Sequence, residues 1–197
     1  MNVVELRQYT LKAGARDTLI ELFDREFVET QEKHGMRIVG QFRDLDRADR
    51  FVWLRGFADL ASRAPALTAF YTSDVWRRNS AAANATMLDS SDVLLLRPAR
   101  PGSGFALDGL ERPPPGAERP AATVFATICS LDGPLEPVDL ASATYVTEPG
   151  PNDFPALPVR EGENVVVWFG HEPVRPPAGF AEPQVLRLAP TARSLLR

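Results

Sequence analysis

Alternating apolar and polar residues predict the first strand of this chain, and a change of period predicts its first helix. Residues 3–9 (Val-Val-Glu-Leu-Arg-Gln-Tyr) alternate as in a strand with two different faces. From about residue 14 to 34 the spacing becomes helical, with Ile20, Phe23 and Phe27 on one stripe. Similar patterns predict strands over 36–43, 50–56 and 93–97 and helices over 58–72 and 74–87. This β-α-β-β-α-α-β order indicates an α+β, ferredoxin-like unit with helices on one face of an antiparallel sheet.

The second half of the chain weakly repeats the strand patterns of the first. Residues 3–11 align with 123–131, residues 50–56 with 164–170, and residues 93–98 with 185–190. The repeat leaves 14 residues between Gly170 and Val185, several of them proline, where the first half has two helices. Proline interrupts helices. We therefore expect two tandem halves of which the second has lost its helices and is mainly β.

Proline also marks the domain boundaries. Pro65 is the single proline in residues 1–97, whereas 17 of the 18 prolines lie in residues 98–197. The Pro/Gly-rich stretch that begins at Pro98 is typical of an extended linker. We predict a ferredoxin-like unit over 1–98, a linker over 99–120 and a degenerate second unit over 121–197.

Composition excludes several classes of protein and partner. One Cys and two His are too few for a disulfide scaffold or a structural zinc site, so we expect no metal. No phosphate-loop or dinucleotide-binding motif occurs, so we expect no cofactor. The net charge of −4 argues against a nucleic-acid partner. Apolar runs such as 165–169 are far shorter than the roughly 20 residues of a membrane span. With no signal-peptide pattern at residues 1–15, we expect a soluble, cytoplasmic protein without a membrane partner.

The repeat predicts which strand face the helices cover. In the first unit this face would carry four apolar residues, Val4, Leu6, Val52 and Leu54. Its counterpart in the second unit would be left uncovered, with Val124, Ala126, Val166, Trp168, Leu186 and Leu188. Leaving such a face in water forgoes on the order of 10 kcal/mol. We expect a homodimer to cover it, or else the proline-rich segments that carry Phe154 and Phe180.

The opposite face of the first unit carries charge. Alternation places Glu5, Arg7 and Tyr9 together on one strand. Phe51, Trp53 and Arg55 share a face of another strand, joined by Gln41 and Arg43. If the two sheets meet, this face becomes the inside of a barrel that contains buried charges. Buried charges must be paired, so Glu5 should contact Arg7 or Arg55.

This charged face has two interpretations. It is either an ion-pair cluster that fixes strand register, or a site where Arg7 and Arg55 hold an anionic or carbonyl ligand. In the second interpretation Tyr9 is the proton donor, with a pKa lowered by the nearby arginines. Phe51, Trp53 and Tyr71 then shape the cavity, with Glu5 and Gln41 beside the ligand.

Several strings resemble the NIPSNAP family. They are Glu-Leu-Arg-Gln-Tyr-Thr-Leu-Lys (5–12), Gly-Gln-Phe-Arg-Asp-Leu-Asp (40–46), Arg-Phe-Val-Trp-Leu-Arg-Gly-Phe (50–57), Ala-Leu-Thr-Ala-Phe-Tyr (66–71), and Val-Trp (75–76). Residues 152–163 resemble a stretch in the second half of tandem bacterial members. The resemblance implies a fold of the dimeric α/β-barrel superfamily, in which two sheets close into one barrel.

The same resemblance bears on function. The wider superfamily includes cofactor-independent oxygenases, cyclases and isomerases, so it implies a bacterial protein that binds a small hydrophobic acid or carbonyl compound and can act on it. The 152–160 loop would be a lid, with Asn152, Phe154 and Arg160 as candidate ligand contacts. The alternative is a non-catalytic accessory protein that docks partners on its exposed second sheet.

Overall fold

The computed structural model describes residues 1–131, 133 and 139–197. Strands and helices are mixed along the described chain, which confirms the predicted α+β class. In chain order the elements are β1 Val3–Leu11, α1 Arg16–Leu22, the π-helical turn η1 Phe23–Phe27, α2 Val28–Lys33, β2 Arg37–Asp44, β3 Arg50–Phe57, α3 Leu60–Tyr71, α4 Asp74–Thr86, β4 Met87–Pro98, β5 Val124–Ser130, β6 Ala143–Thr147, β7 Val165–Gly170 and β8 Gln184–Pro190.

Local signals in the sequence set the ends of the helices. At the start of α3, Asp59 accepts a hydrogen bond from the Ser62 backbone N–H (2.8 Å) while the Ser62 hydroxyl oxygen accepts one from the Asp59 N–H (3.2 Å). At the start of α4, the Ser73 hydroxyl oxygen accepts from the Trp76 N–H at 3.2 Å. Gly35, with a φ of +86°, ends α2 in a conformation that suits glycine. The predicted helices therefore lie within two residues of their observed positions.

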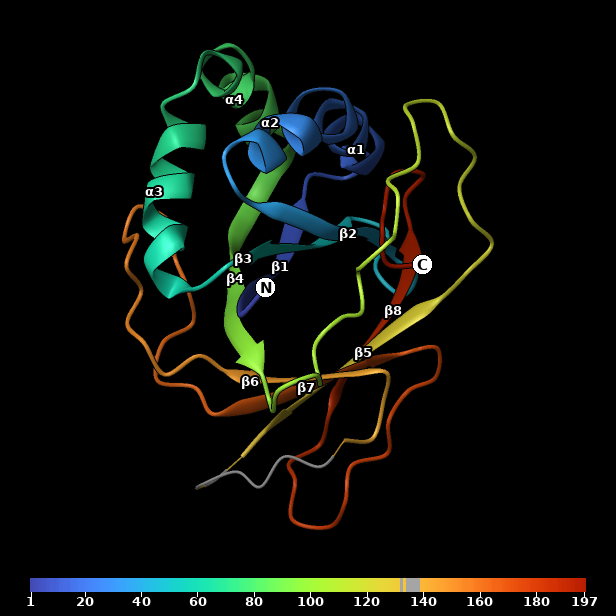
Figure 1. The fold of residues 1–197 in the computed structure, drawn as a ribbon. Coiled ribbons are helices and arrows are strands. Elements are labelled where there is room, and N and C mark those ends of the chain that lie inside the picture. The colour runs from blue at the N-terminus through green and yellow to red at the C-terminus, as the bar shows by residue number, and fades with distance from the viewer. Residues whose placement is uncertain (132, 134–138) are drawn as a thin grey trace.

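The strands form a closed barrel in the order β1-β3-β2-β8-β5-β7-β6-β4. Around the barrel, the strands of the first half lie in the order β4-β1-β3-β2 and those of the second half in the order β8-β5-β7-β6. Numbered within its own half, each set therefore has the order fourth, first, third, second. They join through the pairs β2–β8 and β4–β6. Figure 1 shows all helices packed on the first set of strands, while the second set has loops on its outer side.

The barrel interior is apolar, and the predicted assignment of strand faces is wrong. Val4, Leu6, Val52 and Leu54 point into the barrel and pack against apolar residues of β5, β7 and β8. Both faces of the first sheet are buried, one against the second sheet and the other against the helices, so burial alone does not tell which face turns inward. In the second sheet, the alignment of β7 is also off by one residue, which reverses the faces predicted for β7. The sequence alignment pairs Val52 with Val166, but Val166 lies on the outer side of the barrel.

The outer face of the second sheet is covered by the chain's own loops. Cys129, Val166 and Trp168 are almost fully buried there, packed against partly buried residues that include Val174 and Phe180. The ring centroids of Trp168 and Phe180 are 5.6 Å apart. The uncovered apolar face that motivated a homodimer is therefore not present. The predicted role of Phe180 as cover agrees with the structure, but that of Phe154 is wrong, because Phe154 packs on the helix-side cluster of the first half. The homodimer stays a prediction.

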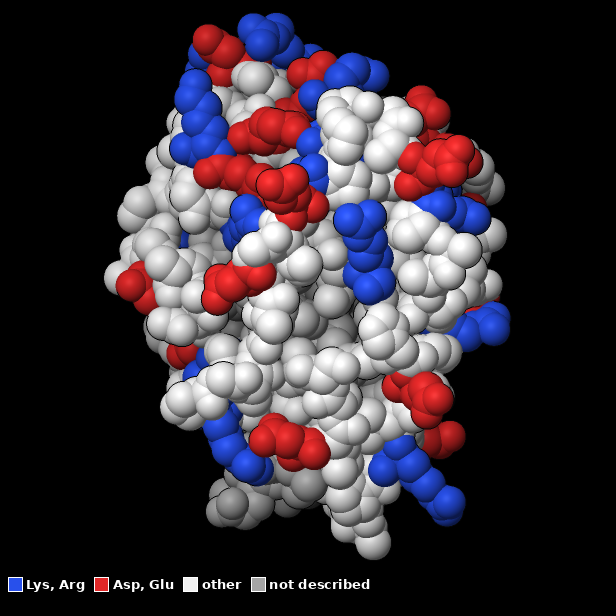
Figure 2. Space-filling view, turned by 45° about the vertical axis from the view of Figure 1, so that its right-hand side comes forward, with Lys and Arg blue, Asp and Glu red and all other residues white. Residues whose placement is uncertain are grey.

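The described part of the chain contains no helix with the length and apolar character that a membrane crossing requires. On the face shown in Figure 2, acidic and basic side chains are interspersed. They are denser over the helical upper part of the molecule than over the lower part, which is built from β5–β8.

Candidate functional site

Four charged side chains meet in the layer between the first sheet and the helices. Glu5 on β1 lies at the centre: its Oε2 accepts from Arg7 Nη1 (2.7 Å) and Arg55 Nε (2.8 Å), and its Oε1 accepts from Arg63 Nε (2.7 Å). Arg7 comes from β1, Arg55 from β3 and Arg63 from α3. At most 1% of any of these side chains is exposed. The predicted pairing of Glu5 with Arg7 or Arg55 is therefore observed with both, and a third arginine joins them.

The position of this charged cluster corrects the sequence interpretation. The cluster does not lie in the barrel, because the side chains adjacent to it on β1 and β3, such as Tyr9 and Trp53, pack with helix residues. Burial alone would raise the pKa of the Glu5 carboxyl, but Arg55, Arg7 and Arg63 outweigh it and hold that pKa far below its usual range. Glu5 is therefore an anion in the folded protein at all ordinary pH values.

Tyr9 extends the cluster towards the helices. Its hydroxyl oxygen accepts a hydrogen bond from Arg7 Nε at 2.9 Å. Burial raises the pKa of Tyr9, and the neighbouring Arg7 and Arg55 only partly oppose that effect. The predicted lowering of this pKa is wrong, because the side chain is too deeply buried for the arginines to dominate. Tyr9 is therefore neutral at neutral pH.

An aromatic cavity of about 30 Å³ lies next to Tyr9. Its walls come from β1, β3, the first residue of β4 and every helical element of the first half. The lining residues are Tyr9, Leu19, Phe23, Phe27, Gln31, Trp53, Phe70, Tyr71, Trp76 and Met87. Gln31 links the cavity to the cluster, since its Oε1 accepts from Arg55 Nη1 at 3.1 Å. Predicted cavity residues Trp53 and Tyr71 are thus in its wall.

Trp53 joins the charged and aromatic parts of the site. The Arg55 guanidinium lies 5.1 Å and the Arg7 guanidinium 5.6 Å from the centre of the Trp53 ring, within cation–π range. The Trp53 Nε1–H is buried and has no hydrogen-bond partner among the described residues. A buried donor of this kind is costly unless something accepts its hydrogen bond.

The π-helical turn η1 sets the position of the aromatic wall. The Phe23 ring on this turn packs edge-on against two rings, with 4.8 Å between its centroid and that of Trp53 and 5.6 Å to that of Phe51. Phe51 therefore supports the wall from behind, without lining the cavity. Asp24, next along the turn, accepts from Gln41 Nε2 at 2.6 Å. Gln41 is thus bound to the turn and is not part of the Glu5 cluster.

The loop between β6 and β7, residues 148–164, closes the site from the second half of the chain. Asn152 Oδ1 accepts from Arg63 Nη1 at 3.1 Å, and Asp153 forms an ion pair with the same nitrogen. Phe154 stacks on Tyr71 with 6.1 Å between ring centroids. Arg160 does not reach the cluster, because it pairs with Glu163 (2.6 Å) and Asp92 (3.2 Å).

The sequence interpretation missed Arg63 and Asp153. A usable signal for Arg63 exists: it lies three, four and seven residues before Ala66, Leu67 and Phe70, which form the buried stripe of α3. An arginine on the apolar stripe of a helix indicates a buried ionic partner. The contact of Asp153 with Arg63 joins residues 90 positions apart, and no local pattern could have predicted it.

Other candidate chemistry in the described residues is limited. No group of three or more His, Cys, Asp or Glu is placed there to hold a metal ion. Cys129 is buried and its pKa is raised by that burial, as expected for a small apolar residue.

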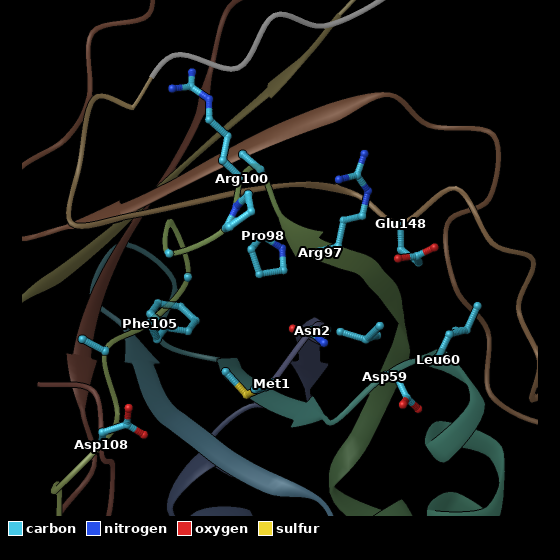
Figure 3. A pocket seen from close by; sticks show the side chains of 16 residues that line it. Met1, Asn2, Asp59, Leu60, Arg97, Pro98, Arg100, Phe105, Asp108 and Glu148 are labelled. Carbon is cyan, nitrogen blue, oxygen red and sulfur yellow. The ribbon is translucent and has the colours of Figure 1, made fainter.

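A separate open groove of about 720 Å³ lies between the N-terminus, the end of β4 and the start of α3. Figure 3 shows Met1 and Asn2 at its base, with Arg97, Glu148 and Leu60 on one side and Phe105 on the other. Several of its polar groups already have partners: Asp59 caps α3, and Glu148 accepts from the Gly150 N–H at 3.0 Å. None of the predicted site residues lines this groove.

Two solved structures share this α+β fold over nearly the whole chain. A Lactobacillus acidophilus NCFM protein matches with a TM-score of 0.54 and 11% identity over 100% of this chain and 98% of its own. A Fusobacterium nucleatum subsp. nucleatum protein matches with a TM-score of 0.55 and 8% identity over 96% of this chain and 92% of its own. Both are provisionally assigned as monooxygenases. At such identities the likeness shows the fold alone.

A family match is found for the first half of the chain. Residues 4–101 match the NIPSNAP family model, and this half of the chain is a NIPSNAP domain, as the sequence motifs predicted. A NIPSNAP domain protein from Burkholderia xenovorans is 18% identical, with a TM-score of 0.44, over 49% of this chain and 93% of its own. No curated protein matches the chain.

Proposed function

We propose that this NIPSNAP protein binds a small hydrophobic acid or carbonyl compound in the layer between the first sheet and the helices. The observation that supports the proposal is the excess of buried positive charge beside an aromatic cavity. Three arginines (Arg7, Arg55 and Arg63) face two carboxylates, Glu5 and Asp153. One positive charge is left without a counter-charge in this cluster, and a buried charge of that kind favours an anionic ligand.

The aromatic wall of the cavity favours a ligand with an apolar body. Phe27, Phe70 and Trp76 present apolar ring surfaces to the cavity, and Trp53 adds a free Nε1–H donor. Small-molecule sites are usually mainly apolar and contain a small number of polar groups. The preferred ligand therefore has a flat apolar body and one carboxylate or carbonyl group.

Binding requires the site to open. A cavity of about 30 Å³ holds about one water molecule. The Phe154 ring stacked on Tyr71 is only partly buried and comes from a loop, so it is the element that can move aside at the lowest cost. This proposal keeps the lid role of residues 152–160.

We further propose that this site catalyses a cofactor-independent cyclisation, isomerisation or oxygenation of the bound compound. Tyr9 keeps its proton because its pKa is raised, so its hydroxyl can donate a hydrogen bond to a ligand carbonyl oxygen. The same raised pKa makes it a weak general acid. Binding and polarisation of the ligand are therefore better supported than complete proton transfer.

We also propose that the two strand sets are tandem ferredoxin-like halves of a dimeric α/β-barrel protein, the second half without helices. The matching strand orders support this relation. The bacterial type, the cytoplasmic location and a homodimer remain proposals of the same kind.

Native mass spectrometry of freshly purified protein tests the binding proposal, because it reports co-purified ligand and subunit number together. The companion variant is Arg55→Met, with Arg43→Met as the control, since Arg43 pairs with Asp17 outside the cluster. We expect a bound hydrophobic acid in the wild type and in Arg43→Met, and at least tenfold weaker binding in a folded Arg55→Met. Equal binding by both variants would remove Arg55 from the site.

The non-catalytic accessory protein is the second candidate, and the packed apolar barrel favours it. The exposed second sheet on which it was expected to dock partners is not present, because loops cover that face. In that case the Glu5 cluster only fixes the packing of helices on the sheet. Absence of any ligand mass, together with no binding of hydrophobic acids at millimolar concentration, would support this candidate over the first.

A further inference from the structure

We infer that Arg63 is the carboxylate-binding subsite of this protein, and that the Asp153 carboxylate occupies it when no ligand is bound. The inference rests on the proposed function and assigns the acid group of the ligand to a particular side chain. The ligand class it predicts is a monocarboxylate whose acid group is separated from its aromatic body by a short flexible chain.

Arg63 is the arginine of the cluster that faces away from the aromatic cavity, towards the loop. Its Nε is used by Glu5, and its Nη1 is shared by Asn152 and Asp153. Its Nη2 is buried and has no hydrogen-bond partner among the described residues. The Arg63 side chain is fully buried, so this free donor is a standing energetic cost in the closed state. A ligand carboxylate that bound Nη1 and Nη2 together would remove that cost.

Asp153 is suited to leave Arg63. It comes from the β6–β7 loop, its side chain is 25% exposed, and it can be hydrated as soon as the loop moves. The Phe154 ring that follows it stacks on Tyr71 in the cavity wall. Displacing these two adjacent residues would therefore free the carboxylate seat and open the aromatic cavity in one movement.

The spacing along α3 sets the size of the ligand. Arg63 and Phe70 lie seven residues apart on the buried side of this helix, about 10 Å along its axis. Arg63 is at the loop end, and Phe70 is in the cavity wall. A benzoate is too short to reach from one to the other, whereas an arylalkanoate with three or four methylene groups approaches this length once the reach of the arginine side chain is included.

The test uses 4-phenylbutyrate and its uncharged amide as probes, with binding measured by calorimetry. In Asp153→Asn the competing charge is removed while the side chain keeps its size. We expect this variant to bind 4-phenylbutyrate about tenfold more tightly than the wild type, and to bind the amide no better than the wild type does.

Asp92→Asn is the matched control, because Asp92 also ties the loop to the body, through Arg160, but does not contact Arg63. It should change the affinity for 4-phenylbutyrate less than twofold. Equal gains in the two variants, or an equal gain for the amide, would show that loop opening alone improves binding, and would overturn the inference.

The remaining outcomes separate this inference from the proposed function. If the wild type binds 4-phenylbutyrate and Asp153→Asn binds it no more tightly, the ligand acid does not replace Asp153, and the binding proposal survives. If neither protein binds either probe at millimolar concentration, both the inference and the proposed function fail. A folded Arg63→Gln variant should bind the acid and the amide equally weakly.

Discussion

The two outer faces of the barrel differ in what covers them and in what they bury. Outside β1 and β3, helices bury Glu5 with three arginines and an aromatic cavity. Outside β5 and β7, proline-rich loops bury Trp168 and Val166 in an apolar cluster. Loops are enough to exclude water from a few apolar rings, but buried charges need partners from several directions at once. The helices provide them, with Arg63 from α3 and Gln31 from α2.

This difference is the reason for placing the proposed site on the helix-covered face. The strands β5, β6 and β7 under the loops contain no charged residue, and Phe180 packs against Trp168. The helix-covered face has excess positive charge and free buried donors at Trp53 and Arg63. Under the proposed function, two strand sets with the same order serve as a scaffold on one side and as a binding site on the other.

The largest effect should come from removing the central anion of the helix-covered face. Glu5→Gln keeps the size of the side chain but leaves three buried arginines without their common partner. We expect a loss of about 3–5 kcal/mol in the free energy of unfolding, measured by urea denaturation. Glu21→Gln on an exposed position of α1 is the control, with an expected change below about 0.5 kcal/mol. A loss below about 1 kcal/mol in Glu5→Gln would mean that the cluster does not hold the helices on the sheet.

The loop-covered face should respond less. Phe180→Ala removes a partly buried ring from Trp168, and we expect a loss of about 2 kcal/mol in urea denaturation. Trp168 fluorescence should shift to longer wavelength as water reaches its ring. Val185→Ala, on an exposed position of β8, should change the stability by less than about 0.5 kcal/mol. If both variants behave alike, the loop does not cover this face in solution.

Acid should act on the helix-covered face through Glu5. Its folded-state pKa is lowered by the arginines, so its contribution to stability is present above the unfolded-state pKa of about 4.3 and is lost as the pH falls below that value. The difference in unfolding free energy between wild type and Glu5→Gln should be constant from pH 5 to 8 and shrink below about pH 4. A difference that stays constant down to pH 2 would contradict the shared anion.

Alkali should have the smallest effect, through Tyr9. Burial raises its folded-state pKa, so the stability it contributes is complete below the unfolded-state pKa of about 10 and is lost as the pH rises beyond it. Tyr9→Phe lacks this loss, so the wild type should lose stability relative to the variant above about pH 10. Absorbance of tyrosinate near 295 nm gives an independent readout. Parallel curves up to pH 11 would show that Tyr9 ionises equally easily in both states.

Local pattern was sufficient for the helices, for most of the strands and for the central ion pairs, whereas β6 was not predicted and β4 begins at Met87, before the predicted strand. The capping residues and the spacing of Ile20, Phe23 and Phe27 predicted the helices, although the π-helical turn at Phe23–Phe27 has no signal that distinguishes it from an ordinary helix. Alternation grouped Glu5, Arg7 and Tyr9 on one face, and the structure keeps them together. Arg63, Asp153 and the separation of Gln41 from the cluster depend on contacts between distant segments.

By itself, the sequence determined the helices, most of the strands, the family of the first half and which residues of β1 and β3 share a face. Only the tertiary structure decided which face turns inward. Both faces of the first sheet are buried, one by the second sheet and the other by helices, so the usual contrast between a dry and a wet face is missing. The choice between them depends on the layer that each face meets: the apolar face packs on apolar residues of the second sheet, and the charged face meets the helix that carries Arg63.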